Sequence, residues 1–276
     1  MNRKNSNEPR SQPTLPTSKK WLVDGFLYFS SRMVAKQFQS FAIQVNGAEL
    51  DRIPPTTPVV VFANHASWWD PISASLIRQK YFSNRIFYAP IDADALKNYR
   101  IMAELGFYGL KLNTIRGAAD FLATTQVILQ TPNSALFITP EGKFTDVRDH
   151  SPELMPGLSH LVSKVPEIVF VPLALEYGFW DESRPQIFAK LGDAIHCDHR
   201  KHAETELNKS QWNELLTQRL RQTQTELASS VIQREGSAFQ YVIASRPKRL
   251  GWYDYFRSWR AFLRGHKFDP RHSAPN

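Results

Sequence analysis

The sequence passes from apolar to polar residues in the stretch Val59-Val60-Val61-Phe62-Ala63-Asn64-His65-Ala66-Ser67-Trp68-Trp69-Asp70-Pro71. Its first four residues are apolar without alternation, which is typical of a strand buried on both faces in a parallel sheet. Asp70-Pro71 is a favourable helix start, because proline is tolerated at the first helical position. The stretch therefore predicts a buried strand that ends near His65 and gives way to a helix.

Strands and helices alternate along the rest of the chain, which indicates an α/β fold. Besides 59–62, we predict strands at Arg85 to Ala89, Ala135 to Thr139, Ile168 to Glu176 and Gln186 to Leu191. We predict helices at Pro71 to Gln79, Ala93 to Leu105, Ala118 to Leu129 and Glu204 to Arg234. The predicted fold is a single domain with a mixed, largely parallel sheet flanked by helices, including amphipathic helices near both termini.

The chain divides into three predicted segments. Residues 1–20 are rich in Pro, Ser and Asn, lack the apolar centre of a signal peptide and are expected to form a flexible tail. Residues 21–245 form the domain, which begins with an amphipathic helix from Trp21 to about Phe41. Charged residues interrupt this helix, so it has no apolar run of the length that a bilayer requires. Residues 246–276 form a basic and aromatic carboxyl-terminal segment.

Charge and cysteine content narrow the possible partners. A formal net charge of +8 implies an anionic partner, which could be a phosphate-bearing substrate, an anionic membrane or nucleic acid. The single cysteine, Cys197, excludes a disulfide framework within the chain. It stands in the run His196-Cys197-Asp198-His199, which lacks the paired ligand spacing of zinc sites and which we interpret as a polar loop. We expect neither a bound metal nor a cofactor.

His65 and Asp70 suit acid–base chemistry. They follow a predicted strand, and α/β proteins place their active residues at such strand ends. A histidine can act as a base near neutral pH, and a carboxylate one helical turn later can bind its other nitrogen and fix its tautomer. A second interpretation needs no catalysis, because Ser67 and Asp70 have the spacing of a capping box that would start the helix.

Four short motifs follow one another along the chain. The first is Asn64-His65 with Asp70 five residues after the histidine, and the second runs from Gly109 to Ile115-Arg116. The third is Thr139-Pro140-Glu141-Gly142-Lys143-Phe144-Thr145, and the fourth is Val171-Pro172-Leu173-Ala174-Leu175. In these motifs and their order the chain resembles the lysophospholipid (1-acylglycerol-3-phosphate, PlsC-like) acyltransferase family, whose motifs are Asn-His-x-x-x-x-Asp, a glycine followed by an apolar stretch and an arginine (matched loosely here), Phe-Pro-Glu-Gly with a polar stretch, and a Val-Pro strand.

The resemblance implies an O-acyltransferase that moves a fatty acyl group from an acyl thioester, acyl-CoA or acyl carrier protein, to a hydroxyl of a membrane lipid. His65 would be the general base, and Asp70 would orient it. The residues expected to bind substrate are Asn64, Ser67, Arg116, Glu141, Gly142, Lys143 and Thr145. Arg116 would offer a planar cation for a phosphate, although it could also be a solvated loop residue. The alternative for Glu141 is a simple strand-to-loop turn.

The third motif departs from the pattern of members that use lysophosphatidate. Those members usually read Glu-Gly-Thr-Arg-Ser, and this chain has Phe144 in the place of the arginine. A site for a phosphate monoester thus lacks its obvious ligand, although Lys143 or Arg148 could compensate. The acceptor could be another lysophospholipid, or a sugar hydroxyl as in relatives that acylate glycosylated lipids or carotenoid glycosides.

Residues 252–264 separate at helical spacing into an aromatic face and a neighbouring basic face. The aromatic face holds Trp252, Tyr255, Phe256, Trp259, Phe262 and Leu263, and the basic face holds Arg257, Arg260 and Arg264. This pattern predicts an interfacial helix on an anionic membrane surface, and hence a peripheral enzyme at the cytoplasmic face of the membrane. A terminal helix docked on the domain is the alternative.

Two other classes of protein fit parts of the sequence. The basic charge suits nucleic-acid binding, but the sequence has no zinc-finger spacing, recognition-helix signature or aromatic RNA-binding motif, so no nucleic-acid partner is expected. A lipid hydrolase could use His65 and Asp70 on water or with a nucleophilic serine. The sequence has no Gly-x-Ser-x-Gly motif, however, and Ser67 lies too close to His65 along the chain to assume a triad.

Overall fold

A computed structural model of the chain describes residues 13–198, 207–244, 259–260 and 262–263. In this part of the chain the strands are β1 (Phe41–Gln44), β2 (Val59–Ala63), β3 (Ile86–Asp92), β4 (Phe107–Leu110), β5 (Ser134–Ile138), β6 (Glu167–Gly178), β7 (Gln186–Leu191), β8 (Ile195–Asp198) and β9 (Gln240–Ile243). The helices are α1 (Lys20–Gln37), α2 (Gly47–Leu50), α3 (Asp70–Tyr81), α4 (Ala93–Asn98), α5 (Ile115–Leu129), α6 (Gly157–Val162) and α7 (Lys209–Gln233). Two short 3-10 helices are η1 (Arg100–Glu104) and η2 (Gly236–Ala238).

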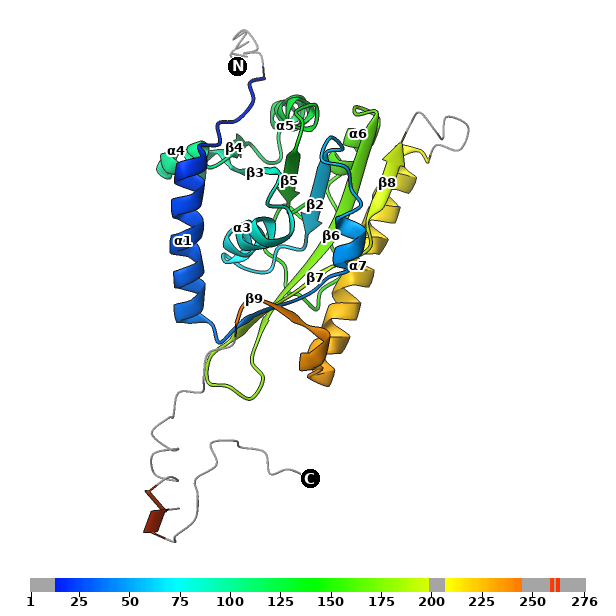
Figure 1. Ribbon diagram of the computed structural model, residues 1–276. Helices are drawn as coiled ribbons and strands as arrows, with labels where there is room; N and C mark the ends of the chain where they lie inside the picture. The colour runs from blue at the N-terminus through cyan, green and yellow to red at the C-terminus, as the bar shows by residue number, and fades with distance from the viewer. Residues whose placement is uncertain (1–12, 199–206, 245–258, 261, 264–276) are drawn as a thin grey trace, which may run out of the picture.

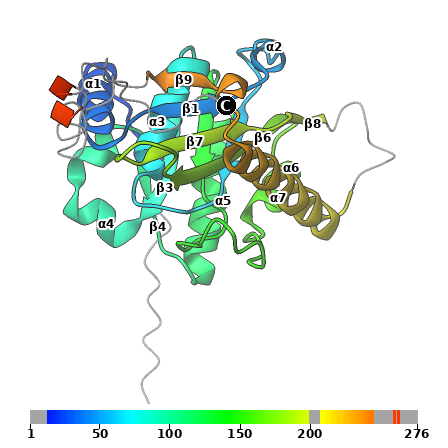
Figure 2. The same ribbon diagram turned by 90° about the horizontal axis from the view of Figure 1, so that it is seen from below.

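The described strands form one mixed sheet in the order β4-β3-β5-β2-β6-β7-β1-β9, and β8 pairs with β6. Strands β4, β3, β5, β2 and β6 run parallel, whereas β7 and β8 run antiparallel to β6. Helices α1 and α3 cover one face, and α5, α6 and α7 cover the other (Figures 1 and 2). The predicted single α/β domain with a mixed, largely parallel sheet is thus confirmed.

Strand β2 lies in the middle of the sheet and is buried along its whole length. Val59 and Val61 pack with apolar residues of α1 and α3, whereas Val60 and Phe62 pack with those of α5, α6 and α7. Successive side chains of a strand point to opposite faces, so a strand covered on both faces is apolar at every position. This burial explains why the sequence of β2 shows no alternation.

The helix predicted for Ala93 to Leu105 is divided into α4 and η1. The Asp92 carboxylate accepts the backbone N–H groups of Asp94 and Ala95 at 2.9 and 3.0 Å, which caps the start of α4. The chain leaves helical geometry at Tyr99, where φ is −120° and ψ is 64°, and then continues as η1. A single uninterrupted helix was therefore the wrong prediction for this segment.

The interpretation of the run that begins at His196 as a polar loop is wrong for residues 196–198. These residues belong to β8, which pairs antiparallel with the first half of β6. Cys197 is buried on this strand, and His196 before it is exposed. Cys197 is the one buried residue of this four-residue strand. The sequence therefore lacks the alternation of apolar and polar residues that would predict a strand.

Helix α1 confirms the amphipathic helix predicted from Trp21, although the helix ends at Gln37 and Phe41 already begins β1. Its inner face buries Leu27, Ser30 and Val34, while its outer face exposes the aromatic side chains Trp21, Tyr28 and Phe29. No helix in the described ranges is long and apolar enough to cross a membrane.

The predicted carboxyl-terminal segment, residues 246–276, lies outside the described residues apart from Trp259, Arg260, Phe262 and Leu263. These four belong to short helical pieces and are exposed. Of the predicted amino-terminal tail, residues 1–12 also lie outside the described residues, and Ser18 forms an isolated bridge with Leu105.

Candidate active site

His65 and Asp70 meet in the loop that joins β2 to α3. His65 Nδ1 lies 2.8 Å from Asp70 Oδ2. The Asp70 side chain is 3% exposed and the His65 side chain 21%, so a ligand can reach the imidazole but not the carboxylate behind it. With Nδ1 engaged by Asp70, Nε2 is the nitrogen that is left to accept a proton from a bound hydroxyl.

Three donors converge on the Asp70 carboxylate. Besides His65, the backbone N–H of Ser67 donates to Oδ2 at 3.0 Å, and the Tyr177 hydroxyl donates to Oδ1 at 2.7 Å. The Ser67 contact is one half of the capping box that the sequence predicts. Asp70 therefore starts the helix and binds the histidine at the same time, so the two interpretations of this residue are compatible.

The Ser67 hydroxyl is engaged within its own loop. It accepts the backbone N–H of Trp69 at 3.2 Å instead of completing the capping box with the N–H of Asp70. The loop therefore gives no support to a triad in which this serine is the nucleophile of a hydrolase.

Asn64 is buried, and its side chain is used within the sheet. Its Nδ2 group donates to the carbonyl of Leu175 at 2.9 Å, and its Oδ1 accepts the N–H of Leu175 at 2.8 Å. The amide thus imitates a strand backbone and extends the β2–β6 pairing beyond Ala63. Asn64, expected among the substrate-binding residues, is placed where it fixes the loop before His65.

The third motif forms a β-turn after β5. The N–H of Gly142 donates to the carbonyl of Thr139 at 3.1 Å, with Pro140 at the second position of the turn, where its fixed φ fits. Gly142 has a φ of +66°, and a Cβ atom on it would lie 2.7 Å from Met155 Sδ. The backbone conformation therefore favours glycine here, and a larger residue would also have to displace the flexible Met155 side chain.

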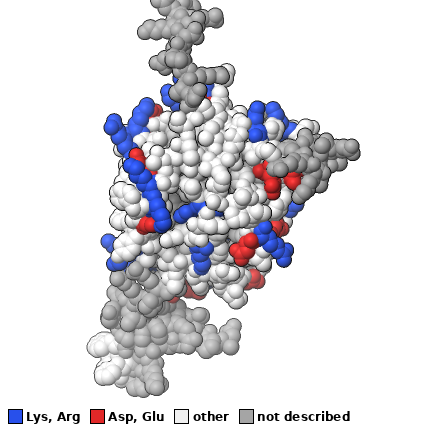
Figure 3. Space-filling view, turned by 45° about the horizontal axis from the view of Figure 1, so that its top comes forward, with Lys and Arg blue, Asp and Glu red and all other residues white. Residues whose placement is uncertain are grey.

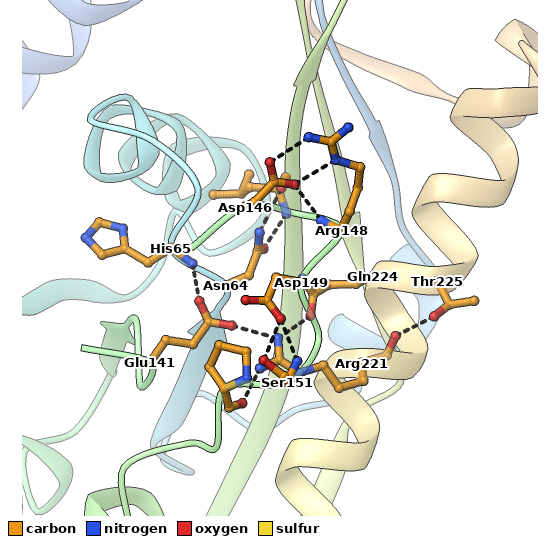
Figure 4. Close-up of polar contacts among 12 residues, drawn as sticks. Asn64, His65, Glu141, Asp146, Arg148, Asp149, Ser151, Arg221, Gln224 and Thr225 are labelled. Atoms are coloured by element: carbon orange, nitrogen blue, oxygen red, sulfur yellow. Dashed lines mark hydrogen bonds and ion pairs between the residues drawn. The ribbon is translucent and has the colours of Figure 1, made fainter. Parts of the chain in front are cut away.

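This turn aims the Glu141 carboxylate at the backbone of His65 and at helix α7 (Figure 4). Oε2 accepts the N–H of His65 at 3.1 Å, and Oε1 pairs with Arg221 Nη1 at 2.6 Å. The Glu141 side chain is 1% exposed and that of Arg221 12%, so the ion pair is buried. Glu141 is thus both part of a turn and a support of the loop that carries His65.

Arg221 is held by further acceptors on the same side. Its Nη1 also donates to the side-chain oxygen of Gln224 at 2.7 Å, and its Nη2 donates to the carbonyl of Pro152 at 2.6 Å. Figure 4 shows how the arginine reaches from α7 to the turn beside His65, whose ring points away from Glu141.

The segment after the turn closes on His65 from the other side. The N–H of Thr145 donates to the carbonyl of His65 at 2.8 Å, so both backbone groups of the histidine are bound by the third motif. The Phe144 ring, which is exposed, packs on the imidazole with the ring centroids 4.2 Å apart and an interplanar angle of 33°. The contact makes one side of the imidazole apolar.

Lys143 and Arg148, which could replace the family arginine that is absent at position 144, have different partners. Arg148 binds Asp146 through Nε and Nη2 at 2.8 and 2.7 Å, and this pairing lowers the pKa of Asp146 and raises that of Arg148. Lys143 is exposed and lies close enough to Asp149 to help lower the pKa of that carboxyl, after the larger effect of its bonds with Ser151. The guanidinium of Arg148 is therefore already occupied.

Arg116 lies in the first turn of α5, which follows β4. Its Nε atom is 4.0 Å from Asp120, and its side chain is exposed. Because β4 and β2 run parallel with two strands between them, Arg116 follows the same edge of the sheet as His65, at some distance along it. A role for Arg116 in binding a phosphate stays a prediction.

Sequence reasoning missed Tyr177 and Arg221. Tyr177 stands two residues beyond the fourth motif, and Arg221 lies on α7, for which we predicted a helix and no role in the site. Neither belongs to a motif, so the single local signal was an arginine next to Leu216 and Leu220, two buried apolar residues of that helix. Within the described part of the chain, no three His, Cys, Asp or Glu side chains gather as metal ligands.

A histidine and a carboxylate at the carboxyl edge of a parallel sheet place this protein among the α/β enzymes. A family model described as Acyltransferase matches residues 43–176, a range that includes all four motifs. A search of curated proteins found no match. Residues 43–176 thus belong to the family of glycerolipid acyltransferases, and the protein is an acyltransferase, as its resemblance predicted.

Proposed function

We propose that the enzyme transfers a fatty acyl group from an acyl thioester to a hydroxyl of a membrane lipid, with His65 as general base and Asp70 as its orienting partner. The observation that carries this proposal is the 2.8 Å contact between the accessible His65 ring and the buried Asp70 carboxylate. The donor is acyl-CoA or an acyl carrier protein. Neither a metal nor a cofactor takes part in the proposed reaction.

In the proposed reaction, His65 Nε2 removes the proton of the acceptor hydroxyl as its oxygen attacks the thioester carbonyl. A carbon–oxygen bond forms and a tetrahedral oxyanion results. Its collapse breaks the carbon–sulfur bond, and the imidazolium returns the proton to the departing thiolate. Asp70 stabilises the imidazolium between the two proton transfers and holds the tautomer with Nδ1 protonated.

The surroundings of His65 favour an acceptor without a phosphate monoester. Phe144 stands where a phosphate-binding arginine would be expected, and Arg148 is engaged by Asp146. We propose a lysophospholipid whose phosphate is a diester as the acceptor. A glycosylated lipid or carotenoid glycoside is the second candidate, because the exposed rings of Trp68 and Phe144 would pack well against a sugar.

The reaction can be tested with the purified protein, acyl-CoA or acyl carrier protein, and a panel of lipid acceptors. Release of free thiol and formation of acylated lipid should appear together in the wild-type protein. We expect His65→Ala to lose roughly 10²- to 10⁴-fold in rate while staying folded. Thiol release without an acylated product would instead identify a thioester hydrolase, and an active, folded His65→Ala protein would disprove the mechanism.

We also propose that the enzyme works as a peripheral protein on an anionic membrane at its cytoplasmic face, where acyl thioester donors are available. The net charge of +8 and the exposed aromatic side chains of α1 support this proposal. Figure 3 shows a broad uncharged area of the surface with Lys, Arg, Asp and Glu side chains around its margin.

Flotation with liposomes tests the membrane proposal. Trp21→Ala combined with Phe29→Ala should weaken binding at all salt concentrations, because apolar contacts are not screened by salt. Arg260→Gln should weaken binding only at low salt. Equal flotation of both variants and the wild-type protein would contradict the proposed contribution of these side chains.

A further inference from the structure

We infer that Tyr177 is a positioning residue for the His65–Asp70 pair, holding the Asp70 carboxylate through its hydroxyl; the inference rests on the proposed function. Tyr177 Oη donates to Asp70 Oδ1 at 2.7 Å, on the opposite side of the carboxylate from His65. Tyr177 belongs to β6 and lies just beyond the matched residues 43–176.

The geometry of β6 brings Tyr177 to this place. Leu175 binds the Asn64 amide, and Tyr177, two residues further along the same strand, points to the same face of the sheet. Its ring packs near Phe38, and its hydroxyl also lies 3.2 Å from Ser73 Oγ on α3. Strand β6 therefore holds both Asn64, which precedes His65, and the Asp70 carboxylate, which follows it.

The hydroxyl can act only as a donor to Asp70. Burial first, and the neighbouring Asp70 charge second, raise the pKa of Tyr177 well above its ordinary value. The phenol therefore keeps its proton throughout the neutral pH range. Its hydrogen bond draws part of the negative charge of Asp70 away from the oxygen that faces His65.

This distribution of charge determines in which direction the pH–rate profile should move when the Tyr177 hydroxyl is removed. Without the hydroxyl, more negative charge faces His65 Nδ1, which favours the protonated imidazole. A general base works only when neutral, so the acidic limb of the pH–rate profile should move to higher pH. The carboxylate also loses one of its anchors, which should lower the maximal rate.

Other charged groups near the pair stay in place in such a variant. Glu141 and Arg221 neutralise each other behind the His65 backbone, and Lys143 lies near enough to Asp149 to contribute to lowering the pKa of that carboxyl. Glu176 precedes Tyr177 in β6 and therefore points to the other face of the sheet. The shift can thus be attributed to the lost hydroxyl.

The test compares the full chain with its Tyr177→Phe variant across pH. We expect kcat to fall about tenfold at the optimum pH with KM unchanged. The acidic limb of the pH–rate profile should move to higher pH by on the order of one unit. Tyr108→Phe is the matched control, because Tyr108 is buried, lies on β4 away from His65, and has its hydroxyl 2.9 Å from Thr125 Oγ1. The control should change stability without moving the profile.

A second readout does not depend on activity. The titration of the His65 imidazole can be followed by NMR, with its signal assigned by its loss in His65→Ala. Its midpoint should rise in Tyr177→Phe and stay in place in Tyr108→Phe. If Tyr177→Phe does not fold, Ser73→Ala replaces it, since losing the second partner of the hydroxyl should produce a smaller shift in the same direction.

Two outcomes would overturn the inference. One is a Tyr177→Phe protein with unchanged kinetics and an unchanged His65 titration. The other is a loss of kcat with neither the pH limb nor the titration moved, which would make Tyr177 a structural residue only. A shifted titration in a protein that transfers no acyl group would support the positioning contact and reject the proposed function instead.

Discussion

Glu141 accepts the backbone N–H of His65 at 3.1 Å, so the third motif supports the main chain of the first. The resemblance assigns Glu141 to substrate binding, yet both carboxylate oxygens are engaged inside the protein, one by His65 and one by Arg221. Substrate contacts from this motif would therefore come from Lys143, Phe144 or the backbone after the turn. The carboxylate itself keeps the histidine in place.

Arg221→Met should destabilise the protein by about 3–5 kcal/mol, because it leaves the buried Glu141 carboxylate without its partner. This loss of stability should become smaller as the pH falls from about 7 to about 5, because the unpaired Glu141 carboxyl can then take up a proton and lose its charge. Chemical denaturation at both pH values measures the effect. Arg219→Met, which changes an arginine on the opposite side of α7, is the control and should cost much less.

Combining Arg221→Met with Glu141→Gln distinguishes the effect of the unpaired Glu141 charge from that of its hydrogen bond with the His65 N–H. Glutamine keeps an oxygen for the His65 N–H and removes the unpaired charge, so the double variant should regain part of the lost stability. A double variant as unstable as the sum of the single variants would show that the two side chains act independently.

Gly142→Ala should lower both stability and rate. A left-handed backbone costs a residue with a Cβ atom about 1–2 kcal/mol, and the new methyl group would press on Met155. Movement of the turn would also displace Glu141 from the His65 N–H. Gly25→Ala is the control, since its Cβ meets open space within α1, and it should stabilise the protein by about 0.5–1 kcal/mol.

Asp70→Asn should reduce the rate by a large factor, on the order of 10²- to 10³-fold, but by less than His65→Ala. In the proposed mechanism the carboxylate orients the base and stabilises its charge, whereas the histidine moves the proton. Steady-state rates and thermal unfolding should be measured on the same preparation. A variant with lower stability and an intact rate would leave Asp70 with its helix-starting role alone.

Phe144→Arg should raise activity on lysophosphatidate relative to the native acceptor, because a guanidinium binds a phosphate monoester bidentately. Phe144→Leu removes the ring without adding a charge, and it should leave the preference among acceptors nearly unchanged. Competition between two labelled acceptors in one assay gives the ratio directly. A wild-type enzyme that already prefers lysophosphatidate would rule the idea out.

The centre of the fold could be predicted from the sequence because its signals are local. Strand β2 is apolar at every position, and Asp70-Pro71 marks the start of α3. Strands β1 and β9 could not be predicted, because they are short and owe their existence to pairing with distant segments. Phe41, which we assigned to the end of a helix, pairs with Ile187 of β7.

The same distinction holds for the site. His65 and Asp70 lie five residues apart, so their spacing alone suggested the contact. Tyr177 is 107 residues from Asp70, and Arg221 is 80 residues from Glu141. The tertiary fold brings these partners together, and the local sequence carries only a weak signal for Arg221 and none for Tyr177.

Strand β7 occupies the position between β6 and β1, although it follows the matched residues 43–176. A fragment cut at the end of that match would leave the apolar second half of β6 as an open strand edge, which invites pairing between copies and aggregation. It would also lack Tyr177 and Arg221. The end of the family match at residue 176 is therefore not the end of the folding unit. Chimaeras with relatives should exchange the whole segment through β9.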